Sequence, residues 1–316
     1  MRIILYLSGE FEELARIEAE TFLSRVLLTD RQITVGECGF NRFERFGLIH
    51  EASLHLFSCE SNELHDFFRE VEIPDGKCCV RVRNIGEKKA DSTKLERELG
   101  AILWKRGAKI SVSNPEYIYR VYLANKAHVG ILLHVTDRKQ FLERRPDLKP
   151  FFRPGAILPR LARSLVNIAL KEGTLLDPMC GTGTIIIEAG LMGLDFLGIE
   201  AYSNIARGCK INLHHYGLPS NILIGDARNL PLKDESVDAI VTDFPYLQST
   251  KALGDLLDLY EKSLSEFKRV LKPNCRLIFI SNLDVEETVK NFEIKYKLYQ
   301  RLHKSLTRRI YICLNS

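Results

Sequence analysis

The residues with the clearest potential for chemistry are four acids in the C-terminal half of the chain, each close behind a short apolar stretch. They are Asp177, Glu200, Asp226 and Asp243. In a sheet of parallel strands, the carboxyl ends of the strands meet at one edge, and ligands bind there. Four acids at successive strand ends are hard to attribute to chance, so we expect them to line one site.

The first acid opens a glycine loop, Asp177-Pro-Met-Cys-Gly-Thr-Gly183, before a helix. Gly181 and Gly183, on either side of Thr182, allow the backbone to approach a ligand closely. Dinucleotide-binding loops have a third glycine where this chain has Ile186, and the Asp177 carboxylate would repel a pyrophosphate. The loop, with Asp177, Gly181, Thr182 and Gly183 as cofactor-binding candidates, therefore favours a cofactor with a cationic or neutral amino-acid end.

The next two acids suit an adenosine. Glu200 lies about 20 residues beyond the glycine loop, where a carboxylate accepts hydrogen bonds from both ribose hydroxyls. Asp226 and the backbone amide of Ala227 can face the adenine edge, although Gly-Asp is also a common turn sequence.

The fourth acid stands in Thr242-Asp243-Phe-Pro-Tyr246. Methyl transfer to an exocyclic amine requires the amine lone pair to be aimed at the methyl group. A carboxylate and a backbone carbonyl can accept the amine hydrogens while a tyrosine ring stacks on the base. We therefore take Asp243, Pro245 and Tyr246 as catalytic candidates; the alternative is a proline-containing strand end with an incidental aromatic.

The composition is that of a globular chain with more than one domain. It has 316 residues, 45% of them hydrophobic and 27% charged. No stretch approaches the roughly 20 apolar residues that cross a bilayer, so we expect no membrane segment. The eight cysteines form neither a Cys-x-x-Cys pair nor a cluster at metal-ligand spacing, which predicts reduced thiols, no metal and a cytoplasmic location.

Charge is unevenly distributed along the chain. Residues 1–75 have 7 Lys and Arg against 15 Asp and Glu, whereas residues 76–150 have 17 against 8. A basic segment suggests a polyanionic partner, although a solvated charged face is the plainer alternative. The RNA-binding candidates are the cations of this segment, namely Arg81, Arg83, Lys88, Lys89, Lys105, Arg106, Lys109, Arg144, Arg145 and Lys149.

The elements that must position these residues divide into two kinds. In the N-terminal part, the residue patterns predict strands at 3–7, 31–38 and 45–50, a helix at 11–23 and a further helix beginning soon after residue 50. Further along, they predict a strand at 78–82, a helix at 93–105 and strands at 117–123 and 128–134. A proline-rich, charged segment at 138–159 is interpreted as a linker. From residue 160 on, helices and buried strands alternate, which predicts a doubly wound, mostly parallel α/β sheet that ends in an antiparallel hairpin at 296–303 and 308–314.

Together these motifs resemble those of amino-methyltransferases, whose fourth motif reads Asp/Asn-Pro-Pro-Tyr. Over nearly the whole chain, the sequence looks like the archaeal-type tRNA guanosine-10 methyltransferases. The supporting stretches are Leu95-x-x-x-Leu99-Gly-Ala, Gly107-Ala-Lys-Ile-Ser-Val-Ser-Asn-Pro-Glu116, Arg153-Pro-Gly, Leu158-Pro-Arg-Leu-Ala-Arg-Ser-Leu-Val-Asn167 and His303-Lys-Ser-Leu-Thr-Arg308. The pattern departs at Phe244, where the family has its first proline, and at Leu247, where it has glycine.

The resemblance implies a ferredoxin-like domain at 1–60, an RNA-binding THUMP domain at 61–137 and, after the linker, a Rossmann-like methyltransferase domain at 160–316. It further implies S-adenosylmethionine as cofactor, tRNA as partner and N2-methylation of guanosine 10, with a monomer favoured. His303, Lys304 and Arg308 are candidates to approach the flipped base. The alternatives are another tRNA guanosine such as position six, a nucleobase amine elsewhere, or an RNA-binding protein without catalysis.

Overall fold

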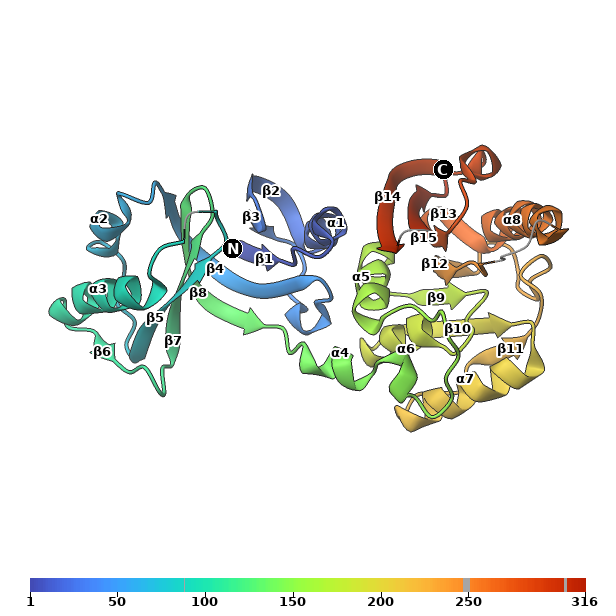
Figure 1. Cartoon of the computed structure of the whole chain (residues 1–316), viewed down its shortest axis with the longest axis horizontal. Coiled ribbons are helices and arrows are strands. Elements are labelled where there is room, and N and C mark those ends of the chain that lie inside the picture. Colours follow the sequence, from blue (N-terminus) through green and yellow to red (C-terminus); the bar gives the residue numbers. More distant parts are fainter. Residues whose placement is uncertain (88, 247–250, 304–305) are drawn as a thin grey trace. The chain divides into compact units, whose positions relative to one another are not determined.

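The computed structural model describes the whole chain except residues 88, 247–250 and 304–305 (Figure 1). Within it, the chain forms two compact units, Met1–Asp137 and Arg138–Ser316. The expected boundary before residue 138 therefore coincides with a boundary between two bodies. We describe each unit by itself.

The first unit is built on one mixed sheet of eight strands. Its strand order is β2-β3-β1-β4-β8-β7-β5-β6, in which β5 runs parallel to β6 and β7 and the other neighbours are antiparallel. The strands are β1 (Arg2–Leu7), β2 (Leu23–Asp30), β3 (Ile33–Cys38), β4 (Ile49–Cys59), β5 (Lys77–Asn84), β6 (Lys109–Ile110), β7 (Tyr117–Leu123) and β8 (Ala127–Val135). The helices are α1 (Glu12–Phe22), α2 (Leu64–Phe68) and α3 (Ser92–Lys105).

Two predictions for this unit were wrong. The strand expected at 45–50 begins only at Ile49. It continues to Cys59 and so occupies the region after residue 50 in which a helix was expected to begin. This strand, β4, lies between β1 and β8 in the interior of the sheet, so its side chains lack the alternation that identifies a half-buried strand. Strand β2 was missed because it follows α1 without any intervening turn residue.

The sheet is continuous across residue 60. Strand β4 pairs with β1 on one side and with β8 on the other. Residues 1–60 and 61–137 therefore share a sheet and a compact unit. Their division into a ferredoxin-like and a THUMP domain stays a proposal.

The second unit has a seven-stranded sheet in the order β11-β10-β9-β12-β13-β15-β14. The first five strands are parallel, and β15 is antiparallel to both β13 and β14. This confirms the predicted mostly parallel α/β sheet with an antiparallel end. The strands are β9 (Thr174–Asp177), β10 (Asp195–Glu200), β11 (Ile222–Ile224), β12 (Val237–Asp243), β13 (Leu271–Ser281), β14 (Glu293–His303) and β15 (Leu306–Leu314); the helices are α4 (Lys139–Glu143), α5 (Pro159–Ala169), α6 (Thr184–Leu191), α7 (Ser203–His215) and α8 (Lys251–Val270).

Helices packed against the buried strands hold the carboxyl edge of this sheet in place. Tyr260 and Phe267 of α8 are fully buried in a cluster with Leu277 and Phe279 of β13. Helix α5 packs against α6 and against strands β12 and β13. Because helices cover the strands, the residues at the strand ends have rigid backbones, which is what a site that must orient a reacting group requires.

The segment 138–159 is not a free linker. It contains α4 and a short 3-10 turn at Pro146–Leu148, and it belongs to the second unit. Arg144 and Arg163 both form 2.8 Å ion pairs with Glu188, whose side chain is 1% exposed. Arg144, one of the charges that made the segment look like a solvated linker, therefore holds it against α6.

Candidate active site at the carboxyl edge of the second sheet

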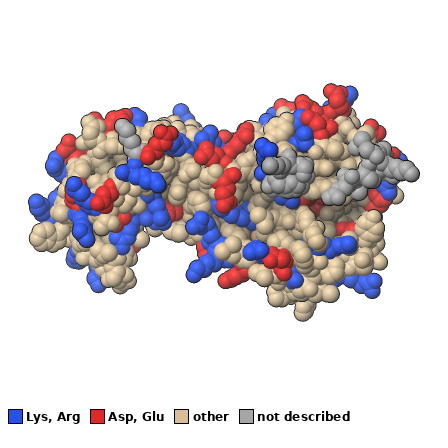
Figure 2. Space-filling model, in the orientation of Figure 1, with Lys and Arg blue, Asp and Glu red and all other residues tan. Residues whose placement is uncertain are grey.

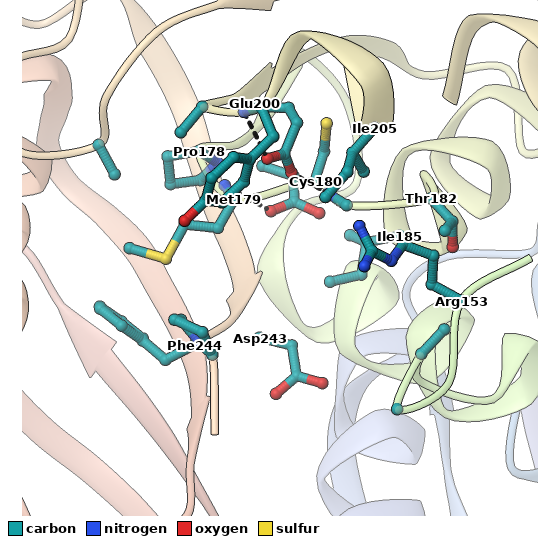
Figure 3. Close-up of a pocket in the computed structure, with 18 of the residues that line it drawn as sticks. Arg153, Pro178, Met179, Cys180, Thr182, Ile185, Glu200, Ile205, Asp243 and Phe244 are labelled. Atoms are coloured by element: carbon teal, nitrogen blue, oxygen red, sulfur yellow. Dashed lines mark hydrogen bonds between the residues drawn. The ribbon is translucent and has the colours of Figure 1, made fainter. Parts of the chain in front are cut away.

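A cavity of about 840 Å³ lies at the carboxyl edge of the second unit's sheet. Its lining includes all four strand-end acids, Asp177, Glu200, Asp226 and Asp243, as well as the glycine loop. Figure 3 labels Glu200, Asp243 and Thr182 among the lining residues. The structure thus brings together the cofactor-binding and catalytic candidates, which the chain spreads over about 70 positions.

The glycine loop joins β9 to α6 in a conformation that needs its glycines. Gly181 and Gly183 have φ values of 53° and 90°. A Cβ on Gly183 would lie 2.6 Å from the Sγ of Cys209. Thr182 between them is buried, and its carbonyl accepts a 2.9 Å hydrogen bond from Asn212. The loop is therefore closed against α7 while its outer face borders the cavity.

Asp177 is the most deeply buried of the four acids. Its Oδ1 accepts hydrogen bonds from Thr242 Oγ1 at 2.8 Å and from the Met179 amide at 3.2 Å. Burial outweighs these bonds and raises the pKa of Asp177 to about 7. Around neutral pH this carboxyl is balanced between its two protonation states, and a cationic ligand would favour the ionised one.

We expect Asp177→Asn to stabilise the ligand-free protein, by roughly 2 kcal/mol at pH 8 and by less at pH 5. Because the folded-state pKa of Asp177 is raised, the cost of burying its charge grows as the pH rises toward 7. Asn has no charge and keeps the oxygen that Thr242 and Met179 bind. Urea unfolding at both pH values measures the difference, with Asp195→Asn at an exposed position as the control. An equal gain at both pH values would contradict the expectation.

Glu200 ends β10 and organises the loops on either side of it. Its Oε2 accepts from the Gly181 amide at 3.1 Å and its Oε1 from the Tyr202 amide at 2.9 Å. The side chain still borders the cavity. Glu200 therefore ties the glycine loop to the second strand end, a role the sequence did not indicate, in addition to the ribose contact expected of it.

Asp226 is more exposed, and its carboxylate is bound by Arg228 through both oxygens, at 3.0 Å to Oδ1 and 2.7 Å to Oδ2. Arg228 lowers the pKa of Asp226, so this acid stays ionised. Ala227 next to it is buried and lines the cavity. The expected adenine contact of Asp226 would thus come from a carboxylate that already has a cationic partner.

Asp243 forms a hydrogen-bonded chain with Tyr246 and Arg308. Tyr246 Oη donates to Asp243 Oδ1 at 2.7 Å, and Arg308 Nε donates to Tyr246 Oη at 2.9 Å. Arg308 Nη2 lies 4.0 Å from Asp243 Oδ2. Burial raises the pKa of Asp243 to about 6, against the opposing effects of Arg308 and Tyr246. The result is a carboxylate that is ionised at neutral pH and aligned by the Tyr246 hydroxyl, which Arg308 holds in turn.

Phe244 takes the place of the family's first proline without blocking the site. It is 1% exposed and stacks on Tyr260, with ring centroids 4.0 Å apart. Its amide donates to the Ile280 carbonyl at 3.0 Å, a bond that proline could not make. The added bulk therefore packs into the core and anchors the strand end, while Pro245 beside it is exposed. Leu247, the other departure, lies outside the described residues.

The RNA-binding candidates of the first unit differ in how free their charges are. Lys89, Lys105 and Lys109 are exposed, and Lys109 forms a 3.6 Å ion pair with exposed Asp75. Arg83 forms a 3.0 Å ion pair with buried Glu51, and Arg106 donates to the carbonyls of Phe68 and Val71 at 3.2 and 2.7 Å. Arg81 donates to the Val112 carbonyl at 2.9 Å; Lys88 is not among the described residues. Figure 2 shows Lys and Arg interspersed with Asp and Glu on the visible face of this unit.

Of the three candidates from the segment 138–159, two make structural contacts within the second unit. Arg144 is largely buried in its pair with Glu188, and Lys149 is 5% exposed and donates to Thr184 Oγ1 at 2.6 Å. We therefore remove both from the RNA-binding candidates. Arg145 is exposed and pairs with Asp147 at 3.0 Å, so it stays one. Of the candidates near the C-terminus, Lys304 and the side chain of His303 lie outside the description, whereas Arg308 lies in the site.

Sequence reasoning named Arg308 as a candidate to approach the flipped base, and the structure places it against Tyr246. It missed Arg153, which lines the cavity and was noticed only inside a stretch that resembles the family. That resemblance was the one available signal for Arg153. In the described part of the chain, no group of three or more His, Cys, Asp or Glu side chains could hold a metal ion, and all eight cysteines are free thiols. No described helix is long and apolar enough to span a membrane.

Comparisons with known proteins agree with this geometry. Residues 146–310 match the RMKL-like methyltransferase domain family. The tRNA (guanine(10)-N2)-dimethyltransferase of Pyrococcus abyssi is 36% identical over 280 residues, which cover 85% of each chain. The enzyme of the same name from Methanocaldococcus jannaschii is 36% identical and covers 79% of this chain and 75% of its own.

A solved structure shows the same fold over the whole length. TrmN from Thermus thermophilus superimposes with a TM-score of 0.54 at 20% identity, covering 99% of both chains. The human tRNA (guanine(6)-N(2))-methyltransferase THUMP3 is a more distant relative, 29% identical over 69% of this chain and 46% of its own. The chain therefore belongs to the family of archaeal tRNA (guanine(10)-N2)-dimethyltransferases.

Proposed function

We propose that the protein transfers methyl groups from S-adenosylmethionine to the N2 amine of guanosine 10 in tRNA. The observation that carries the proposal is the alignment of Asp243 by Tyr246 and Arg308 in a cavity that also has Asp177 and Glu200 in its lining. The position on tRNA is taken from the activity for which the relatives in Pyrococcus and Methanocaldococcus are named.

The lining residues fit S-adenosylmethionine. The cavity volume of about 840 Å³ is within the usual range for small-molecule sites. Glu200 offers carboxylate oxygens for ribose hydroxyls, and Asp177 offers a buried acid to a cationic amino-acid end. When bound, the cofactor supplies an electrophilic methyl group on a sulfonium. The absence of a third loop glycine, with Ile186 in its place, makes a dinucleotide a poorer match.

The chain's own contribution to the chemistry is to hold and deprotonate the amine. The Asp243 carboxylate accepts one amine hydrogen. The backbone carbonyl of the next residue, Phe244, can accept the other. The Tyr246 ring supports the base by stacking. Because the pKa of Asp243 is about 6, the carboxylate is also a suitable acceptor for the proton that the methylated amine releases near neutral pH.

The first unit would hold the tRNA. The division into a ferredoxin-like region at 1–60 and a THUMP region at 61–137 belongs to this proposal, as do a cytoplasmic location and a monomeric working form. Lys89, Lys105 and Lys109 are the exposed lysines among the candidates of this unit. If they contact phosphates, replacing all three with Ala weakens tRNA binding and flattens its salt dependence.

Incubation with labelled S-adenosylmethionine and unmodified tRNA transcripts tests the proposal. We expect label in N2-methylguanosine and N2,N2-dimethylguanosine, and none in a transcript in which guanosine 10 is replaced by adenosine. Label that persists in that transcript and maps to guanosine 6 would favour the activity of the THUMP3 relative. Tight tRNA binding without any incorporation would favour an RNA-binding protein without catalysis.

A further inference from the structure

We propose that Arg153 binds the carboxylate of the cofactor's amino-acid end. The inference rests on the proposed use of S-adenosylmethionine and extends it to a residue that the strand-end acids do not include. Four acids border the cavity, and two arginines are described among its lining residues, Arg153 and Arg228.

Only one of these arginines has its charge available. Arg228 is paired with Asp226 at 2.7 Å and with Asp258 at 3.6 Å. Arg153 is exposed and, among the described residues, has no hydrogen-bond or ion-pair partner. Figure 3 shows its side chain extending from the backbone into the space between the labelled lining residues. An unpaired guanidinium in a cavity rich in carboxylates is suited to a ligand's own anionic group.

The ligand chemistry calls for such a cation at one end. S-adenosylmethionine has two positive groups, the sulfonium and the ammonium, and one negative group, the carboxylate. Asp177 and Asp243 suit positive or hydrogen-donating groups and would repel the carboxylate. The N-terminus of α6, which begins at Thr184 beside Gly183, borders the cavity as Arg153 does and adds favourable potential for an anion.

The loop that carries Arg153 is fixed to the glycine loop. Asn212, which is 0% exposed, binds both the amide and the carbonyl of Phe151 at 2.9 Å and also donates to the Thr182 carbonyl at 2.9 Å. The Phe151 ring lies against Gly208, where a Cβ would be only 2.1 Å from the ring. One buried amide therefore links the arginine loop to the cofactor loop, so the backbone from which Arg153 extends is held beside the cofactor loop before the ligand arrives.

A pair of ligands that differ only in the carboxylate isolates this contact. Affinities for S-adenosylmethionine and for decarboxylated S-adenosylmethionine are measured by calorimetry, without tRNA, on wild type, Arg153→Ala and Arg153→Lys. We expect Arg153→Ala to weaken S-adenosylmethionine binding roughly 10- to 100-fold, to leave the decarboxylated ligand within about twofold, and Arg153→Lys to restore part of the loss. Arg207→Ala, which removes an exposed arginine of α7 outside the cavity lining, is the matched control and should change neither affinity.

Equal losses for the two ligands, or no loss for S-adenosylmethionine, would overturn the assignment of Arg153 while leaving the proposed function intact. Failure of the wild type to bind S-adenosylmethionine would instead overturn the proposed function itself. Because Arg153 is exposed and unpaired, its variants are expected to fold, and unchanged thermal unfolding of the ligand-free proteins verifies this.

Discussion

We expect Asp243→Ala to lower the rate of methyl transfer by about 10³-fold and to leave the affinity for S-adenosylmethionine within about twofold. Without the carboxylate, only the Phe244 carbonyl remains at this strand end to accept an amine hydrogen, and the released proton loses its acceptor. Loss of a group that orients the reactants and accepts a proton typically costs two to four orders of magnitude in rate. Single-turnover reactions at saturating cofactor, with tRNA in the proposed assay, measure the effect directly.

Two further variants define what the carboxylate does. Asp243→Asn keeps an acceptor oxygen but cannot take a proton, so we expect an intermediate loss, about tenfold. Asp195→Ala removes an exposed carboxylate at the start of β10 and should leave the rate unchanged. If Asp243→Ala retained more than a tenth of the wild-type rate, or if its main defect were in cofactor binding, the proposed role at the amine would be wrong.

The site's four acids were predictable because each belongs to a local pattern. A buried strand followed by an acid is visible in a few residues, and parallel strands bring such ends to one edge whatever the loops between them do. The glycine loop at Gly181 and Gly183 was predictable for the same reason, because it follows directly after the first of these strands. The sheet order of the second unit confirmed that these ends are neighbours.

The cations of the site were not predictable in this way. Arg308 and Tyr246 are 62 positions apart in the sequence. They come together because β15 inserts antiparallel between β13 and β14, a pairing that no local pattern encodes. Arg153 stood in a segment whose prolines and charges looked like a linker. The buried pairs of Glu188 and the bonds of Asn212 hold that segment in the second unit, and polar contacts of this kind depend on the tertiary structure.

Arg308→Gln is expected to move the acid limb of the pH–rate profile to higher pH. In the wild type, methyl transfer falls as the pH drops through about 6, because protonated Asp243 no longer accepts the amine hydrogens. The Arg308 side chain is 8% exposed, that of Asp243 is 16% exposed, and their closest atoms are 4.0 Å apart. At that distance a unit charge contributes about 4 kcal/mol in a partly buried setting, and each 1.4 kcal/mol corresponds to a tenfold change in proton concentration at half-titration.

The direction in which the pKa of Asp243 changes follows from the groups that face this carboxyl. Arg308 from β15 is the cation that favours its ionised form, Tyr246 donates a hydrogen bond to it, and Asp177 of β9 is the acid close enough for repulsion, while Tyr260 of α8 stays neutral because burial raises its pKa. Removing the cation therefore raises the pKa of Asp243. If half to two thirds of the attraction is lost, the rate falls about four- to tenfold at pH 7 and about fifteen- to fiftyfold at pH 6, and it recovers near pH 9.

The matched control is Arg309→Gln, because the neighbouring arginine of β15 donates instead to the Asn282 carbonyl at 2.7 Å, away from the strand-end acid. Its pH profile should coincide with that of the wild type. A loss that is uniform from pH 6 to pH 9 in Arg308→Gln would mean that the arginine acts only by holding Tyr246 in place. A shifted limb would instead mean that a cation on the antiparallel strand keeps the Asp243 carboxylate ionised at the pH where the amine must be held.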